Sequence, residues 1–200
     1  MRKASDPRHD RGQGLVEFAM LVPVFLLLVL GLLEFGFIFD QAMTLNYATR
    51  EGARSGAAFA AGNTTTMPCA DVDKNIMAAV QRVLKAPGSR ITASEVAEIR
   101  IYRSAMNGSE AGPVNVWTYA AGAGPAVDGQ NLDFSPSSTG WSACIRDNDG
   151  AAVDSIGVSV RYRYNFVTPL SAIVGFFGPS GASNITISDR TVMALNPTND

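Results

Sequence analysis

The sequence predicts an α+β protein in which a long N-terminal transmembrane helix continues into an exported domain, where an amphipathic helix packs on an antiparallel sheet. Three observations predict this class. An apolar run lies near the N-terminus, a segment with helical hydrophobic spacing follows it, and later segments alternate apolar and polar residues. We divide the chain into a leader or tail at 1–12, a transmembrane and extended helix at 13–61, and an exported α+β domain at 62–200.

The apolar run is long enough to cross a bilayer. From Phe18 to Leu33 no side chain carries a charge, a hydroxyl or an amide, and the apolar character resumes after Glu34. A spanning helix needs about 20 predominantly apolar residues, and residues 15–39 supply them. A cleaved secretory signal is shorter and ends in a small-residue cleavage site, which is missing after Glu34. Glu34 is interpreted as a carboxylate at the outer interface, beside a belt of aromatic residues.

The charges that flank the run predict its orientation. Four basic residues precede it, whereas the far flank has none before Arg50. Basic flanking residues are retained in the cytoplasm. We therefore expect a single pass with the N-terminus in the cytoplasm and the rest of the chain outside. The polar leader itself is expected to be a disordered tail.

Residues 40–61 are rich in alanine and contain no proline, so they are expected to extend the helix beyond the membrane. Small residues recur there at every fourth position and therefore share one helical face: Ala48, Gly52, Gly56 and Ala60. Such spacing allows another backbone to come close. Because glycine costs a helix about 0.8–1.0 kcal/mol relative to alanine, two glycines on one face indicate close packing. The partner is either the chain's own sheet or another subunit.

The exported domain begins with an amphipathic helix in residues 70–88, where Asp71 or Asp73 is a candidate N-cap and Pro87-Gly88 ends the helix. Alternating segments then predict four strands. They start at Val96 (VAEIRIYRS), Val114 (VNVWTYAA), Ser155 (SIGVSVRYRYNF) and Asn184 (NITISDRTVMALN). A single polar face per strand is typical of an antiparallel sheet that is covered on one side.

Two segments of the exported domain lack a clear pattern. Residues 120–154 are rich in Gly, Ser, Pro, Asn and Asp, so we expect a loop-rich insertion there. The apolar stretch TPLSAIVGFFGPSG, at 168–181, is either a short helix that fills the core or an exposed apolar loop near the membrane surface.

The two cysteines, Cys69 and Cys144, both lie in the part expected outside the membrane, where an oxidising compartment permits a disulfide. A bridge would close a loop of about 75 residues, worth roughly 4 kcal/mol in the chain-entropy treatment. Two free thiols are the alternative.

Composition argues against several functional classes. The 16 basic and 18 acidic residues nearly balance, so the chain as a whole is not built to bind nucleic acid. The only histidine, His9, lies in the leader, which leaves no Ser-His or Cys-His pair for the exported domain. Phosphate-binding loops and zinc-protease motifs are missing, and DNDG at 147–150 fits a turn better than a calcium loop. We expect no enzyme, no cofactor and no metal.

The residues from Gly12 to Phe18, Gly-Gln-Gly-Leu-Val-Glu-Phe, resemble the processing signal of type IV prepilins, and the Glu-Phe pair resembles the Flp branch of that family. In that family a membrane prepilin peptidase cuts after a glycine at the cytoplasmic edge. The resemblance implies a cut after Gly12, a new N-terminus at Gln13, and Glu17 as the glutamate that the family carries five residues into its mature chain. An amine on one subunit would then neutralise Glu17 on its neighbour and favour assembly. The alternative is a glutamate that snorkels to the interface.

Residues 12–56 as a whole are similar to the TadE-like family of tight-adherence pilus proteins. The similarity also rests on Pro23, Glu34-Phe35-Gly36 and Arg50-Glu51-Gly52-Ala53-Arg54. It implies a pilin-like fold and a minor pilin or pseudopilin that takes part in assembly of a Flp-type pilus secretion apparatus. Such a protein sits in the bacterial inner membrane with a periplasmic domain. Its partners are membrane lipid, other pilin-like subunits, the assembly machinery and the prepilin peptidase. An uncleaved bitopic scaffold of the same or another envelope complex is the alternative.

Overall fold

The computed structural model describes residues 7–62, 67–148, 153–172 and 184–196, with the side chains of α1 described from Gln13 onward. It confirms the α+β class: a long N-terminal helix is followed by a second helix and a sheet. The chain forms two compact units, which we describe separately. The first contains Met1–Ile38 and Asn165–Asn184, and the second contains Phe39–Tyr164 and Ile185–Asp200.

Helix α1 extends from Pro7 to Phe59 and contains Pro23. Its start corrects the expectation of a disordered tail through residue 12, because the backbone is already helical at Pro7. Proline suits the first helical position, where its fixed φ is already helical and its missing N–H would have no partner. The helix ends two residues earlier than predicted, because Ala60 adopts φ 48° and Gly62 φ 75°. This left-handed exit is a common way to end a helix.

The second helix, α2, comprises Cys69–Leu84 and carries its buried side chains at helical spacing, as the pattern predicts. Its N-cap is Pro68, and no side chain caps it. The candidate caps Asp71 and Asp73 are therefore wrong, since both lie inside the helix. Asp71 in the first turn still places a negative charge where the helix dipole favours one.

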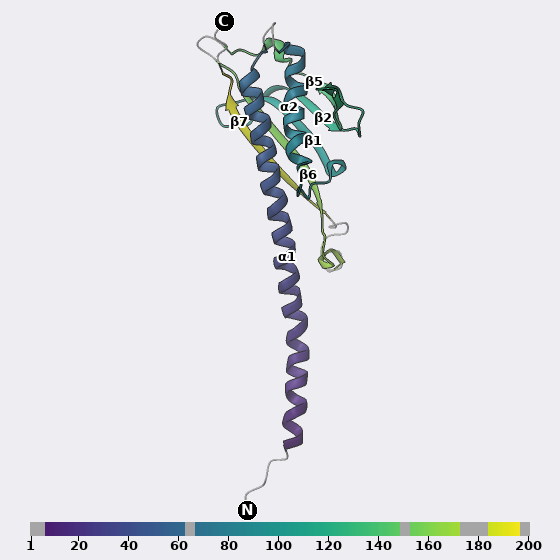
Figure 1. The fold of residues 1–200 in the computed structure, drawn as a ribbon. Helices are drawn as coiled ribbons and strands as arrows, with labels where there is room; N and C mark the ends of the chain where they lie inside the picture. Colours follow the sequence, from purple (N-terminus) through teal and green to yellow (C-terminus); the bar gives the residue numbers. More distant parts are fainter. Residues whose placement is uncertain (1–6, 63–66, 149–152, 173–183, 197–200) are drawn as a thin grey trace, which may run out of the picture. The chain divides into compact units, whose positions relative to one another are not determined.

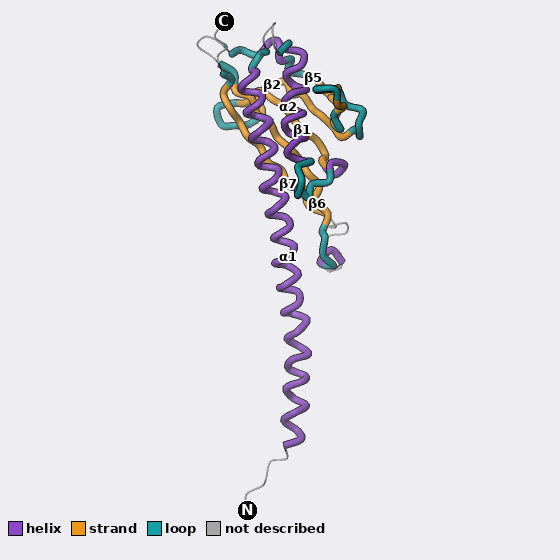
Figure 2. Tube along the Cα trace, in the orientation of Figure 1, coloured by secondary structure: helices purple, strands orange, loops and turns teal. Residues whose placement is uncertain are grey.

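The strands of the main sheet follow the order β5-β2-β1-β6-β7 (Figures 1 and 2). The pairs β1–β2, β1–β6 and β2–β5 are antiparallel. Ile99 of β1 pairs with Trp117 of β2 on one side and Val160 of β6 on the other. The five strands are β1 (Val96–Ser104), β2 (Glu110–Tyr119), β5 (Phe134–Thr139), β6 (Ser155–Asn165) and β7 (Asn184–Ala194).

Residues 120–148, the described part of the predicted insertion up to its gap, are more ordered than predicted. They supply the edge strand β5, a small hairpin of β3 (Ala126–Val127) and β4 (Gln130–Asn131), and a 3-10 turn at Ala143–Ile145. Strand β5 contains Pro136, which cannot donate a ladder hydrogen bond and is tolerated because β5 lies at the edge. The expected loop-rich insertion is thus wrong for this strand. Of the apolar stretch 168–181, residues 173–181 lie outside the described part of the chain.

In the second unit, α2 and the C-terminal part of α1 lie on one face of the sheet (Figure 1). Apolar side chains from both helices and from β1 and β6 form the core, and each of the following is at most 1% exposed: Leu45, Ala53, Ile76, Val80, Leu84, Ile99, Ile101, Ile156, Val158, Val160 and Tyr164. Alternate residues of β6 supply this face, which is the period-2 pattern expected for a strand with one covered side.

Candidate functional site

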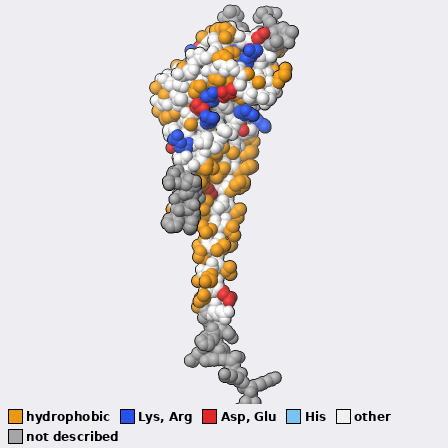
Figure 3. All heavy atoms as spheres, turned by 180° about the vertical axis from the view of Figure 1, so that it is seen from behind, with side chains coloured by type: hydrophobic (Ala, Val, Ile, Leu, Met, Phe, Trp, Pro, Cys, Tyr) orange, Lys and Arg blue, Asp and Glu red, His pale blue; other side chains and the backbone are white. Residues whose placement is uncertain are grey.

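The N-terminal part of α1 exposes an almost continuous apolar surface. The helix from Gln13 to Phe59 is long and apolar enough to cross a membrane, judged by length and composition. Figure 3 shows hydrophobic side chains along this helix. The exposed residues include Leu15, Val16, Phe18, Met20, Leu21, Val24, Phe25, Leu26, Leu28, Leu32 and Leu33. A surface of this kind is stable only when lipid or other apolar side chains cover it. It is the feature of a single-pass membrane anchor.

At the start of this surface the predicted processing and assembly residues follow one another on the helix. The backbone is helical at Gly12, and Gln13 donates from Nε2 to Oε1 of Glu17 at 3.1 Å. Both side chains are exposed. Residues four apart share a helical face, so the residue expected to become the new N-terminus lies one turn from the carboxylate expected to act in assembly.

Near the far end of the run, Glu34 occupies a site that sequence reasoning missed. Only 2% of this residue is exposed. Its two carboxylate oxygens accept hydrogen bonds from the backbone N–H groups of Val167 and Thr168, each at 2.9 Å. The carboxylate therefore holds the segment that follows β6 on the helix. No local sequence pattern predicts this pairing, because the backbone partners of Glu34 lie more than 130 residues away in the sequence.

The small-residue face of α1 is packed inside the second unit. A methyl group placed on Gly52 would come within 2.5 Å of Val80 of α2 and 3.2 Å of Val158 of β6. One placed on Gly56 would come within 2.6 Å of Ile156. Ala48 and Ala60, the other two members of the face, are fully buried, Ala60 just past the helix end. Of the two alternatives, the structure shows this face against the chain's own helix and sheet.

Hydrogen bonds attach the C-terminal part of α1, which carries the small-residue face, to strand β7. Thr49, which is fully buried, donates to the carboxylate of Asp189, and its hydroxyl also lies 3.0 Å from that of Thr191. Asn46, one turn earlier, donates to the same carboxylate at 3.3 Å. Hydrogen bonds to a charged acceptor are stronger than neutral ones. They fix how the helix lies over β7.

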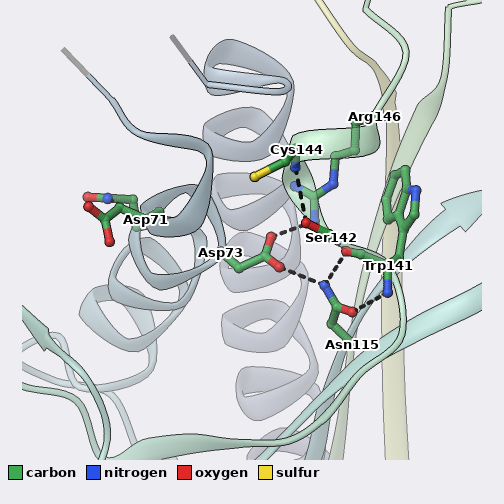
Figure 4. A network of polar contacts seen from close by, with 8 residues as sticks. Asp71, Asp73, Asn115, Trp141, Ser142, Cys144 and Arg146 are labelled. Carbon is green, nitrogen blue, oxygen red and sulfur yellow. Dashed lines mark hydrogen bonds and ion pairs between the residues drawn. The ribbon is translucent and has the colours of Figure 1, made fainter. Parts of the chain in front are cut away.

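The expected disulfide joins Cys69, the first residue of α2, to Cys144 in the 3-10 turn. Next to it lies a buried polar network (Figure 4). Arg146 is fully buried at its side chain, and its Nη2 lies 2.5 Å from Oδ1 of Asp73. The same guanidinium stacks 4.4 Å from the centre of the Trp141 ring.

Asn115 of β2 completes this network. It donates to Asp73 and to the carbonyl of Trp141, each at 2.6 Å, and accepts from the backbone N–H of Trp141 at 2.6 Å. Asp71, by contrast, points away from these residues (Figure 4) and pairs with Lys74. The disulfide and the network together hold the turn against α2. Their role is structural, because Asp73, Asn115, Arg146 and the backbone of Trp141 bond to one another.

The uncovered face of the sheet carries a cluster of paired charges, part of which is visible in Figure 3. Arg100 donates to both oxygens of Glu110, at 2.7 and 2.6 Å, and Arg161 lies 3.0 Å from Glu98. The hydrogen bond from Arg100 lowers the pKa of Glu110, and the same bond raises the pKa of Arg100. Burial raises the pKa of Tyr102 beside them.

Arg100, Glu110 and Arg161 are among the side chains that line a shallow depression of about 360 Å³. Arg100 pairs with Glu110, and Arg161 pairs with Glu98. Among the described residues there is no group of three or more His, Cys, Asp or Glu side chains that could hold a metal ion.

Comparison with known proteins assigns a family resemblance to part of this chain. The family model described as TadE-like protein matches residues 12–54. The resemblance stated from the sequence is therefore confirmed over this segment, which includes Gly12, Gln13, Glu17 and Glu34. No curated protein matches the chain, and no solved structure does.

Proposed function

We propose that this chain is a membrane-anchored minor pilin or pseudopilin that takes part in assembly of a tight-adherence, Flp-type pilus apparatus. The observation that carries the proposal is the TadE-like match over residues 12–54, which falls on the helix whose apolar side chains are exposed. An exposed apolar helix is stable only when it is covered, so these side chains are the surface that assembly would cover. The small, tightly packed α+β domain would be the exported part.

In this proposal prepilin peptidase cuts after Gly12, and Gln13 becomes the N-terminus. The new amine would lie one helical turn from Glu17, close to the depth at which that carboxylate enters the apolar region. A carboxylate there costs less than at the bilayer centre but is still unfavourable. The amine of one subunit would neutralise Glu17 of the next, which favours the assembled state over the isolated chain.

The proposed topology is a single pass through the bacterial inner membrane, with the N-terminus in the cytoplasm and the domain in the periplasm. Basic residues precede the apolar run and are retained on the cytoplasmic side. The Cys69–Cys144 disulfide agrees with an oxidising compartment on the far side.

Mass spectrometry of the N-terminus tests the processing step. We expect a terminus at Gln13 in protein isolated from cells that possess the peptidase. An intact leader in such cells would contradict the pseudopilin assignment. It would favour an uncleaved bitopic scaffold, a second candidate supported by a helix that continues without interruption from Pro7 through Gly12.

Substitution of the carboxylate tests the assembly step. Glu17→Ala should leave membrane insertion unchanged and abolish cross-linking to other pilin-like subunits. Glu51→Ala is the matched control, since Glu51 is a partly exposed carboxylate on the same helix outside the apolar run. Wild-type cross-linking by the Glu17→Ala protein would show that this carboxylate has no role in assembly.

A further inference from the structure

The segment that follows β6, residues 166–172, is attached to the apolar helix by Glu34. Its sequence, Phe-Val-Thr-Pro-Leu-Ser-Ala, contains no charged residue. Val167 is 64% exposed, and Pro169 and Ala172 are exposed as well. This segment is irregular from residue 166 to residue 169 and helical from Leu170. A largely apolar and exposed segment is therefore fastened to a helix that is itself apolar and exposed.

Every backbone N–H from Val167 to Ala172 has an acceptor. Glu34 accepts those of Val167 and Thr168, and proline at 169 has none to offer. Thr168 supplies its hydroxyl to the N–H of residue 170 at 3.3 Å and its carbonyl to that of residue 171 at 3.4 Å. The N–H of Ala172 bonds to the carbonyl of residue 169 at 3.0 Å. On an ordinary surface loop, water would accept hydrogen bonds from such backbone N–H groups. Here protein oxygens accept all of them, so no water is needed.

Complete internal pairing is what irregular backbone requires in a lipid environment, where an unpaired N–H costs several kcal/mol. Glu34 is the only side chain of α1 that supplies two of these acceptors among the described residues. Without its carboxylate, the N–H groups of Val167 and Thr168 would have to turn toward water.

The height of Glu34 on the helix matches the outer boundary of the bilayer. It follows Glu17 by 17 positions, which corresponds to roughly 26 Å of α-helix, close to the hydrocarbon thickness of about 30 Å. With Glu17 at the cytoplasmic edge, Glu34 and the segment bound to it lie at the opposite interface. Carboxylates are tolerated there when they are paired.

We propose that residues 166–172 form a second membrane contact, which Glu34 docks onto the helix and whose exposed apolar side chains lie among the phospholipids of the periplasmic leaflet. The inference rests on the proposed transmembrane anchor. Glu34 acts as a positioning residue: it holds the segment at lipid depth and satisfies the backbone that would otherwise require water.

Depth-dependent fluorescence quenching tests this contact on the full chain in phospholipid vesicles. Because both cysteines of the chain are joined in the disulfide, an added cysteine can be labelled alone. An environment-sensitive fluorophore is placed at Val167→Cys, at Val24→Cys in the apolar run, and at Met106→Cys, which is fully exposed in the β1–β2 turn. The quenchers are lipids spin-labelled at shallow or deep positions of the acyl chain.

We expect strong quenching at position 167 by the shallow spin label, strong quenching at position 24 by the deep label, and none at position 106. Glu34→Leu should abolish quenching at 167 and leave it unchanged at 24. Glu34→Gln, which keeps one acceptor oxygen, should retain part of it. Glu51→Gln is the control on the same helix and should change nothing. Retention of the Cys69–Cys144 bond verifies that each variant has folded.

Three results would overturn the inference, and they are distinguishable. If position 24 is quenched but position 167 behaves like 106, the anchor stands and the second contact does not exist. If position 24 is not quenched, the anchor fails and the inference fails with it. If the signal at 167 appears only when protein density in the vesicles is raised, the occupant is a second copy of the chain rather than lipid.

Discussion

Removing the negative charge of Asp73 should destabilise the exported domain far more than an ordinary surface substitution. The fully buried guanidinium of Arg146 has Asp73 as its carboxylate partner, and its Nε and Nη1 atoms have no hydrogen-bond partner among the described residues. Asp73→Asn would leave this cation buried without a counter-charge and would turn an amide donor toward Asn115. Breaking one side of a buried ion pair costs about 3–5 kcal/mol. The side chain of Asp73 is 18% exposed, so we expect about 3 kcal/mol.

Urea unfolding of the full chain in detergent measures this loss, because the fluorescence of Trp141, stacked on Arg146, reports the network. Asp71→Asn is the matched control on the same helix. Its carboxylate is 42% exposed and pairs with Lys74 at the surface, so we expect a loss below about 1 kcal/mol.

The double variant Asp73→Leu with Arg146→Met removes both charges and should recover most of the stability, because apolar replacements of a buried ion pair are often neutral or favourable. A loss below about 1 kcal/mol for Asp73→Asn would refute the reasoning. A double variant no more stable than the single one would do the same.

Three further predictions concern the exported domain. Cys144→Ser should lower the free energy of unfolding by about 4 kcal/mol, since the bridge closes a loop of 75 residues; reduced wild-type protein should show the same loss in the same urea titration. Gly52→Val should lower the free energy of unfolding by about 1–3 kcal/mol, because the added side chain overpacks against Val80. Gly36→Val is the control: nothing lies within 4 Å of an added Cβ there, so it should leave the free energy of unfolding unchanged. Arg100 lowers the pKa of Glu110 from its ordinary value of 4.5, so this pair stabilises the fold at pH values above 4.5, and the contribution is lost as the pH falls below that value. Glu110→Gln should remove this acid dependence of the unfolding free energy, which is worth less than about 1 kcal/mol for a partly exposed pair. A pH profile of stability that Glu110→Gln leaves unchanged would count against the prediction.

The sequence predicts those elements whose side chains follow a strict period. Helix α2 and strand β6 carry apolar residues at helical and alternating spacing, and both appear where the pattern places them. The apolar run of α1 likewise predicts a helix, and the structure has one there. Glycine at positions 52 and 56 predicts close packing, because a helix retains glycine at a cost. Spacing alone does not identify the partner, and the structure identifies it as α2 and β6.

The elements that sequence reasoning missed depend on distant partners. Strand β5 is rich in serine and contains Pro136, so it reads as a loop, and only its position at the edge of the sheet makes it a strand. Arg146 sits in a segment with loop-like composition, and its burial depends on Asp73 in another element. The sequence predicts Glu34 as an interfacial carboxylate, but it does not predict that the backbone N–H of Val167 donates to it. Local pattern carries no information about such pairs.

The most direct test of the central claim is protease protection in spheroplasts, combined with alkaline extraction of the membranes. We expect the chain to stay in the membrane pellet and external protease to remove the domain. A short N-terminal fragment containing Glu17 should remain protected. Recovery of the whole domain in the soluble fraction, with an N-terminus beyond residue 39, would contradict the account.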